Sequence, residues 1–194
     1  DQIEVEIPAA LRPKLTDADA DGRITFYDLN ASANSAFVRD SNANAFIDAE
    51  DLLADPQWAD GIDSDRNAFV GDFFGWNFRS AADEPFAPND PRDALGHGTH
   101  VAGTIGAIGD NNRGVTGINW RSSLMALKFL DNGNSGQTSD AVSAVNYATM
   151  MRRDQHENVR VLNASWGQSG SESPALRTAI ESAGQADILF VAAA

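Results

Sequence analysis

Cysteine is absent from this chain of 194 residues, which excludes disulfide bridges, thiolate metal ligands and a cysteine nucleophile. Long apolar runs are missing too: none reaches the roughly 18 residues that a membrane span needs. No basic segment followed by an apolar stretch marks a signal peptide in the sequence. Histidine is scarce, with three residues, and two of them lie close together at His97 and His100.

Basic side chains are also few: 14 Lys and Arg residues stand against 28 Asp and Glu residues, for a net charge of −14. Residues 1–100 hold 20 acidic and 7 basic side chains, whereas residues 101–194 hold 8 and 7. Such a chain would repel nucleic acid or an anionic membrane, so we expect neither as a partner. The acidic part is instead predicted to bind cations.

The chain changes character near residue 94. Residues 1–93 are rich in Asp, Asn, Ala, Gly and Pro, whereas residues 94–194 show regular apolar periodicity. Apolar strands alternate there with helices, which is typical of a parallel sheet with helical crossovers. The expected strands are 123–130, 159–166 and 187–194, and the expected helices are 97–108, 138–153 and 173–184. The sequence predicts a partial α/β core behind an irregular acidic region. Because a buried type of strand runs to the last residue, we expect an internal piece of a longer protein.

The acidic region repeats one pattern from three starting points, Asp17, Asp40 and Asp63, which lie 23 residues apart. A twelve-residue calcium loop takes oxygen ligands from positions 1, 3, 5, 7, 9 and 12, and the ligand at position 7 is a backbone carbonyl. The predicted ligands are Asp17, Asp19, Asp21, Arg23 and Asp28; then Asp40, Asn42, Asn44, Phe46, Asp48 and Asp51; and then Asp63, Asp65, Asn67, Phe69 and Asp72. The sequence therefore predicts Ca2+ as the cofactor.

The three loops depart from the ideal pattern to different degrees. The first has Gly22 at position 6, where the chain turns sharply, but the second has Ala45 there, which strains the turn. The third has Phe74 at position 12, so Asp72 would have to serve instead. Two other interpretations stay open. The runs could be solvated acidic turns, or they could form a calcium-dependent docking module, although the short repeat leaves little room for its helices.

The segment GHGTHVAGT, which starts at residue 96, has three candidate roles. His97 and His100 would share one face of a helix and could form a zinc pair. However, no Glu follows at the zincin spacing, and the third histidine, His156, lies in a polar stretch. The pair could also be core histidines with satisfied hydrogen bonds. The glycines beside His97 and the small residues after it favour the third role, a catalytic base at the start of a closely packed helix.

This segment resembles the histidine box of the subtilases, the subtilisin-like serine proteases. The stretches LMALKFLD, VLNASWG and ILFVAAA are similar to family motifs in order and spacing, and FFGWNF resembles a segment ahead of the histidine box. The resemblance covers about residues 60–194. The stretch before it is similar to a calcium-loop insertion of some large exported bacterial subtilases. The resemblance implies a subtilisin-like parallel-sheet core that carries this insertion.

The resemblance also implies a role for each matching residue. His97 becomes the general base that accepts the proton of a serine hydroxyl, and His100 becomes structural and the more buried of the two. Two segments would bind the polypeptide substrate as an added strand. They are Gly133, Asn134, Ser135 and Gly136 on one edge, and Ser165, Trp166 and Gly167 on the other.

Two members of the catalytic triad have no match in the sequence. Family members place the aspartate on an apolar strand before the histidine box, and the nearest strings, at Asp40 and Asp63, fit calcium loops better. The Gly-Thr-Ser nucleophile segment is found nowhere in the chain. We therefore predict a fragment, inactive alone, of a secreted bacterial serine endopeptidase stabilised by calcium. The alternative is a calcium-dependent docking module fused to an inactive peptidase-like domain. A nucleotide-binding α/β domain is disfavoured, because no glycine-rich turn follows the first strand.

Overall fold

The computed structural model of the chain describes residues 6–79, 86–112, 114–120, 122–167 and 172–193. It divides into two compact units that interleave along the sequence. The first unit comprises Asp1–Trp76, Asn89–Pro91 and His97–Ala126, and the second comprises Asn77–Pro88, Arg92–Gly96 and Leu127–Ala194. The division into a region of residues 1–93 and a region of residues 94–194 stays a prediction.

The regular elements are short and widely spaced in the first part of the chain and longer in the second. In chain order they are η1 (Arg12–Lys14), α1 (Phe26–Leu29), η2 (Ser32–Asn34), α2 (Ala49–Ala54), β1 (Gly75–Asn77), α3 (His97–Gly106), β2 (Ala126–Lys128), α4 (Thr138–Arg153), β3 (Val161–Ala164), α5 (Pro174–Gln185) and β4 (Leu189–Ala192).

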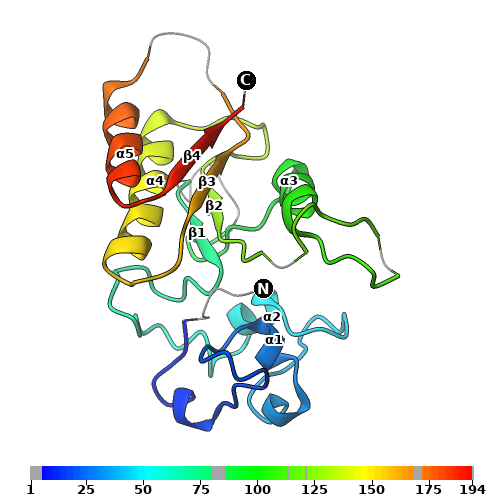
Figure 1. Cartoon of the computed structure of the whole chain (residues 1–194). Coiled ribbons are helices and arrows are strands. Elements are labelled where there is room, and N and C mark those ends of the chain that lie inside the picture. The colour runs from blue at the N-terminus through cyan, green and yellow to red at the C-terminus, as the bar shows by residue number, and fades with distance from the viewer. Residues whose placement is uncertain (1–5, 80–85, 113, 121, 168–171, 194) are drawn as a thin grey trace. The chain divides into compact units, whose positions relative to one another are not determined.

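In the first unit, each of the first two acidic runs leads into a short helix, α1 or α2 (Figure 1). Both helices begin with a capping box. The side chains of Thr25 and Asp48 accept backbone N–H groups of the first turn. In return, the carboxylates of Asp28 and Asp51 accept the N–H groups of these two caps at 2.8 and 3.0 Å. The reciprocal bonds satisfy donors that a helix start leaves unpaired, which stabilises helices of only four and six residues.

The core of the first unit is built from apolar side chains of separate turns. Trp58 is fully buried, its ring meets that of Phe73 edge-on at 6.2 Å between centroids, and its Nε1 donates to the carbonyl of Phe37 at 2.8 Å. The other buried apolar residues of this cluster are Ile7, Leu11, Ile24, Leu29 and Leu52. So small a core holds the acidic runs in place with little regular structure around them.

Helix α3 carries the histidine box and also lies in the first unit. A returning segment closes its C-terminal end: the N–H groups of Gly117 and Ile118 donate to the carbonyls of Ala107 and Thr104 at 2.8 and 3.0 Å. A Cβ on Gly117 would lie 2.4 Å from the backbone nitrogen of Ala107, so only glycine allows this approach. None of the described residues of α3 is buried.

In the second unit, β3 and β4 form a parallel pair in which Val161 lies opposite Leu189. Helices α4 and α5 pack against each other along one face of this pair (Figure 1). Val145 of α4, Ala183 of α5 and Ile188 before β4 are buried between them. The β3–α5–β4 order with parallel strands confirms the predicted α/β character of this part, and α4 has the predicted bounds. The last residue of the predicted strand 187–194 lies outside the described residues.

One part of the predicted parallel sheet is wrong: the strand expected at 123–130 does not lie beside the strand expected at 159–166. Among the described residues, β2 pairs with β1 and not with β3, so that two separate two-stranded sheets result. The N–H of Ala126 donates to the carbonyl of Phe74 at 2.9 Å. Gly75 makes this pairing possible, because a Cβ there would lie 1.8 Å from the carbonyl oxygen of Ala126. The segment FFGWNF therefore supplies a strand that the periodicity did not reveal.

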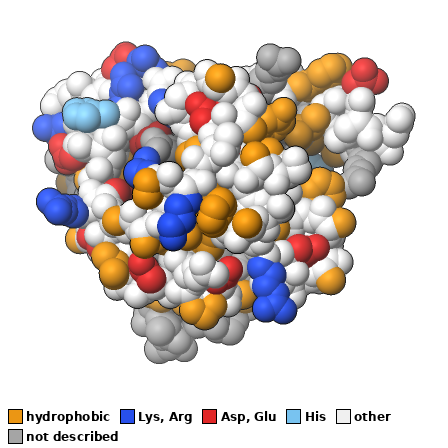
Figure 2. All heavy atoms as spheres, turned by 90° about the horizontal axis from the view of Figure 1, so that it is seen from below, with side chains coloured by type: hydrophobic (Ala, Val, Ile, Leu, Met, Phe, Trp, Pro, Cys, Tyr) orange, Lys and Arg blue, Asp and Glu red, His pale blue; other side chains and the backbone are white. Residues whose placement is uncertain are grey.

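Charges of both signs are mixed on the face of the described residues that Figure 2 draws. On the face drawn in Figure 2, Lys and Arg side chains lie scattered among acidic and uncharged ones, without a single basic patch. Among the described residues, none of the helices has the length and apolar character that crossing a membrane requires.

Candidate functional site

Each of the three acidic runs folds into a turn of the same kind. In each run, the carboxylate at position 1 accepts the backbone N–H groups of positions 5 and 6. Asp17 accepts from Asp21 and Gly22 at 3.3 and 2.8 Å, Asp40 from Asn44 and Ala45 at 3.1 and 2.9 Å, and Asp63 from Asn67 and Ala68 at 3.1 and 2.8 Å. The repeat seen in the sequence is therefore a repeat of geometry, with three turns built by the same bonds.

Position 6 has a left-handed backbone in every run. The φ angles there are 90° at Gly22, 70° at Ala45 and 73° at Ala68. Glycine adopts this conformation freely, whereas a residue with a Cβ is strained by about 1–2 kcal/mol. The strain expected at Ala45 from its sequence position is thus present in the structure, and a second alanine shares it.

We expect Ala45→Gly to raise the free energy of unfolding by about 0.5–1 kcal/mol, because relief of the strain outweighs the added entropy of the unfolded chain. Urea denaturation measures the change. The matched control is Gly22→Ala, which should lower the free energy of unfolding by a similar amount because it places a Cβ on a left-handed backbone. No atom lies within 4 Å of the position that the new Cβ would take, so backbone strain is the only unfavourable contribution. A loss of stability in Ala45→Gly would contradict the proposed strain.

The last position of the first two runs is occupied by a buried carboxylate that bonds back to position 2. Asp28 Oδ1 accepts the N–H of Ala18 at 2.7 Å, and Asp51 Oδ1 accepts the N–H of Ser41 at 2.6 Å. Asp28 and Asp51 are both almost fully buried. Each carboxylate therefore joins the end of its run to the beginning and caps a helix at the same time.

In the third run this place is taken by a residue from elsewhere in the chain. Position 12 is Phe74, and Glu6 Oε1 accepts the N–H of Ser64, at position 2, at 2.7 Å. Its second oxygen accepts the N–H of Asp72 at 3.1 Å. The sequence pointed to Asp72 for this role, but Asp72 bonds to the side chain of Asn67 instead, at 2.9 Å. Glu6 was missed because no spacing within its own segment links it to a run that begins 57 residues later.

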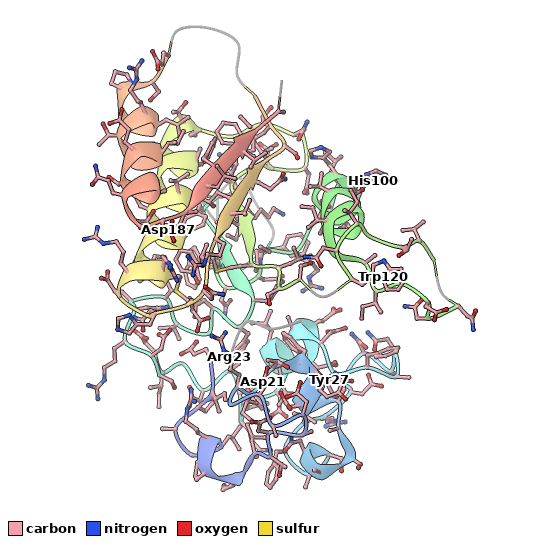
Figure 3. All side chains as sticks on the ribbon, viewed as in Figure 1. Asp21, Arg23, Tyr27, His100, Trp120 and Asp187 are labelled. Carbon is pink, nitrogen blue, oxygen red and sulfur yellow. The ribbon has the colours of Figure 1, made fainter. Side chains whose placement is uncertain are left out.

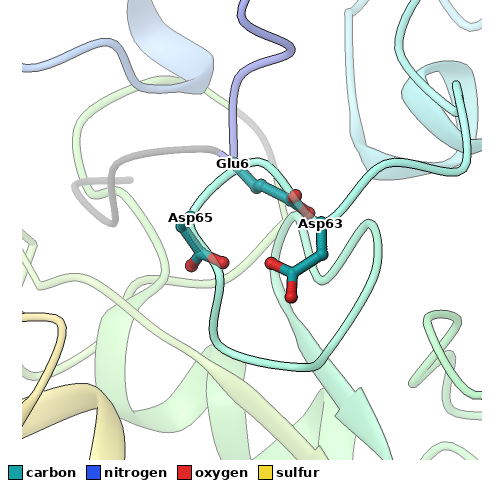
Figure 4. A group of neighbouring side chains, drawn as sticks. All are labelled: Glu6, Asp63 and Asp65. Carbon is teal, nitrogen blue, oxygen red and sulfur yellow. The ribbon is translucent and has the colours of Figure 1, made fainter.

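At two of the runs, the carboxylates lie close enough together to bind a cation, one at each run. The ligand oxygens of Glu6, Asp63 and Asp65 lie within 4.8 Å of one another, and these side chains point toward one another across the turn (Figure 4). The ligand oxygens of Asp17, Asp19 and Asp21 also lie within 4.8 Å of one another, and Figure 3 labels Asp21. The second run has amides, Asn42 and Asn44, at positions 3 and 5, so its predicted ligands carry less negative charge.

The third run concentrates negative charge in a partly buried place. Burial, opposed by hydrogen bonds and reinforced by the Asp72 carboxylate, raises the pKa of Glu6 to about 6. Burial and the charge of Asp72 likewise raise the pKa of Asp65 to about 7. A bound divalent cation would relieve this repulsion, because oxygen ligands of this kind suit a hard cation.

Both histidines of the box lie on α3 and both are exposed. His97 is the first residue of the helix, after Gly96, whose φ is 94°; His100 follows one turn later (Figure 3). The burial expected for His100 is not found among the described residues, because both histidines are exposed and none of the described residues of α3 is buried. The groups of metal-ligating side chains found among the described residues contain carboxylates and no histidine, which gives no support to a zinc pair.

The two predicted substrate-binding edges lie in the second unit and are joined there by aromatic packing. The Phe129 ring, just after β2, meets the Trp166 ring edge-on at 4.9 Å between centroids. Gly136 folds back against the same strand end, since a Cβ there would lie 2.2 Å from the carbonyl oxygen of Phe129. The segment 133–136 and Gly167 are exposed. Ser165 and Trp166 are half-buried. Both edges rest on one aromatic pair, whereas His97 belongs to the first unit.

Comparison with known proteins decides the family. The sequence model of the Subtilase family matches residues 28–194. The chain belongs to the subtilase family. Subtilases are serine peptidases, and the match includes the second and third acidic runs as well as the histidine box and both edge segments.

This subtilase is similar to proteases from distant organisms. It is 30% identical to Subtilisin-like protease 1 of Plasmodium berghei (strain Anka) over 152 residues, which cover 78% of the chain and 22% of the relative. It is 43% identical to Subtilisin DY of Bacillus licheniformis over 102 residues, 53% of the chain and 34% of the relative. It is 39% identical to Subtilisin amylosacchariticus of Bacillus subtilis subsp. amylosacchariticus over 110 residues, 57% of the chain and 27% of the relative. The chain therefore spans about a third or less of the length of these curated relatives.

Proposed function

We propose that this chain supplies the general base and both substrate-binding edges of a subtilisin-type serine endopeptidase, whose catalytic aspartate and serine lie outside the 194 residues. The observation that carries the proposal is the histidine box, which folds as a helix beginning at His97 in a chain that belongs to the subtilases. The exposed imidazole of His97 is accessible to a serine hydroxyl. Asp40 and Asp63 are unsuited to orient it, because each accepts two backbone N–H groups of its own turn.

The chemistry follows from these positions. His97 would accept the proton of the serine Oγ as that oxygen attacks the scissile carbonyl, and would then pass the proton to the leaving amine. Water would hydrolyse the acyl-enzyme by the same proton transfers in reverse. The segments 133–136 and 165–167 would hold the polypeptide between them by backbone hydrogen bonds, as an added strand.

Cleavage of a blocked peptide anilide by the full-length protein tests this proposal. We expect hydrolysis that phenylmethylsulfonyl fluoride abolishes, because the reagent sulfonylates an activated serine. The 194-residue chain alone should cleave nothing, and it is the matched control for non-specific hydrolysis. Full-length protein that is folded and cleaves no peptide would contradict the proposal.

We further propose that the three acidic runs bind calcium, with Glu6 completing the third. The identical turns support this, as does the convergence of carboxylates in two of them. Calcium loops would stabilise a small core in a chain that has no cysteine, as part of an exported, extracellular bacterial protein. Helices α1 and α2 have only four and six residues, which favours a stabilising insertion over a docking module that presents a helical pair.

A further inference from the structure

The loop between β2 and α4 is organised by one side chain. Asp131 lies three residues after the end of β2, and its Oδ1 accepts the N–H groups of Gly133 and Ser135 at 2.8 and 3.0 Å. Its own N–H donates to the carbonyl of Ser135 at 2.8 Å. Asn134, between these residues, has a φ of 58°, so the turn is tight. The loop is thus closed upon Asp131, although its tip is exposed.

Arg79 holds Asp131 from the other side. Its Nη2 lies 3.4 Å from Oδ2 of Asp131, and its Nη1 lies 2.9 Å from Oδ2 of Asp140, in the first turn of α4. The Arg79 side chain is only 7% exposed, against 24% and 20% for the two aspartates. One buried guanidinium therefore joins the start of the loop to the start of the helix that follows it.

The electrostatics of this group favour the ionised pair. Hydrogen bonds from Ser135 and Gly133, together with the charge of Arg79, hold the pKa of Asp131 below its usual value. Removing one member of an ion pair whose guanidinium is buried leaves the other charge uncompensated, which is unfavourable. Without Arg79, the two aspartates would repel each other and Asp131 would lose the group that orients it.

We propose that Arg79 is a positioning residue for the substrate, because it fixes the backbone of residues 133–136 through Asp131 and Asp140. The proposal rests on the proposed function, in which this segment pairs with the polypeptide. An edge that binds by backbone hydrogen bonds must hold its N–H and carbonyl groups at fixed positions, and small displacements weaken such binding strongly. A peptide of several residues uses this edge, whereas a single residue at the cleavage site does not reach along it.

The proposal is tested by the kinetics of full-length Arg79→Met on two blocked anilides. One substrate is a tetrapeptide, and the other is a single residue with the same side chain at the cleavage site. We expect kcat/KM for the tetrapeptide to fall about 10- to 100-fold, mainly through KM, while that for the single residue changes little. Arg79→Lys should recover part of the loss, since lysine keeps the charge but not the planar fork. The matched control is Arg160→Met, which removes an exposed pair with Asp187, at 53% and 80% side-chain exposure, and should leave both substrates unaffected.

Amide hydrogen exchange at Gly133 and Ser135 provides a second readout that does not depend on activity. We expect faster exchange at both amides in Arg79→Met than in the wild type and in Arg160→Met. If the wild type cleaves neither anilide, the proposed function fails, and the exchange rates still decide whether Arg79 orders the loop. Unchanged exchange together with an unchanged ratio of the two kcat/KM values would overturn the proposal. If Arg79→Met does not fold, Asp131→Asn serves in its place with the same expected results.

Discussion

Alanine in place of His97 is expected to lower kcat of the full-length peptidase about a million-fold, the loss that removal of the triad histidine causes in subtilisin. The imidazole is the only group in the triad that both accepts and returns the proton, so nothing nearby replaces it. Stability should change by about 0.5 kcal/mol or less, because the side chain is exposed in this chain. Peptide cleavage and urea denaturation of the same preparation measure the two effects.

His100→Ala is the matched control for that substitution, since both histidines lie on α3 and both are exposed. Compared at equal folded fraction, it should keep activity within about tenfold, because it removes no proton-transfer group. If His97→Ala leaves the peptidase active, the general base is another residue and the proposed function is wrong. If both alanine variants lose activity equally, the helix rather than the imidazole is responsible.

Calcium removal is expected to lower the melting temperature by about 5–10 °C for each site that was occupied. An ion present at 100 times its dissociation constant stabilises the folded state by about 2.7 kcal/mol per site, and about 1 kcal/mol corresponds to 2–4 °C for a chain of this size. Circular dichroism melts in calcium chloride and in a calcium chelator measure the shift. Magnesium is the control cation, because it holds its water more tightly and suits a different geometry.

Single substitutions assign the calcium effect to individual runs. Glu6→Gln should remove the share of the third run and Asp19→Ala that of the first, and the two losses should add because their sites share no ligand. Asp60→Asn, outside the predicted ligands, keeps the oxygen that accepts the N–H of Ile62 and should leave the calcium shift intact. A calcium shift that survives Glu6→Gln undiminished would show that Glu6 is no ligand.

The stability of the calcium-free protein should depend on pH, and the raised pKa values of the third run fix the direction of the change. The pKa values of Glu6 and Asp65, about 6 and about 7, lie above the ordinary 4.5 and 3.8, so the folded state binds protons more tightly than the unfolded one. The stability from this source is fully present below about pH 4 and is lost as the pH rises through 6 and 7. Asp65→Asn should flatten this fall, and calcium should oppose it by binding the deprotonated carboxylates.

Local spacing explains why much of the structure was predictable. The acidic turns depend on bonds between residues two to five apart, so the alternation of carboxylates and amides predicts them directly. Helix α4 has the predicted bounds because its apolar period and its first and last residues are all local features. The histidine box likewise predicts a helix that starts at His97.

The features that escaped prediction all depend on distant partners. Glu6 reaches the third run from the far end of the first unit, and no periodic pattern marks it. The pairing of β1 with β2 depends on Gly75, whose close approach to Ala126 is a matter of tertiary structure. The burial expected for His100 required a partner surface for α3 that the described residues do not supply.

The sequence separation of Glu6 from its run bears on the order of folding. The first two runs close over ten residues, from Ala18 to Asp28 and from Ser41 to Asp51, whereas Ser64 and Glu6 are 58 residues apart. Closing the longer segment costs roughly 1.5 kcal/mol more in chain entropy, and such distant contacts form late. The first two turns can therefore assemble as soon as they are synthesised, while the third waits until Glu6 has met Ser64 and Asp72. In a refolding experiment, calcium binding by the third run would mark the moment at which Glu6 has met that run.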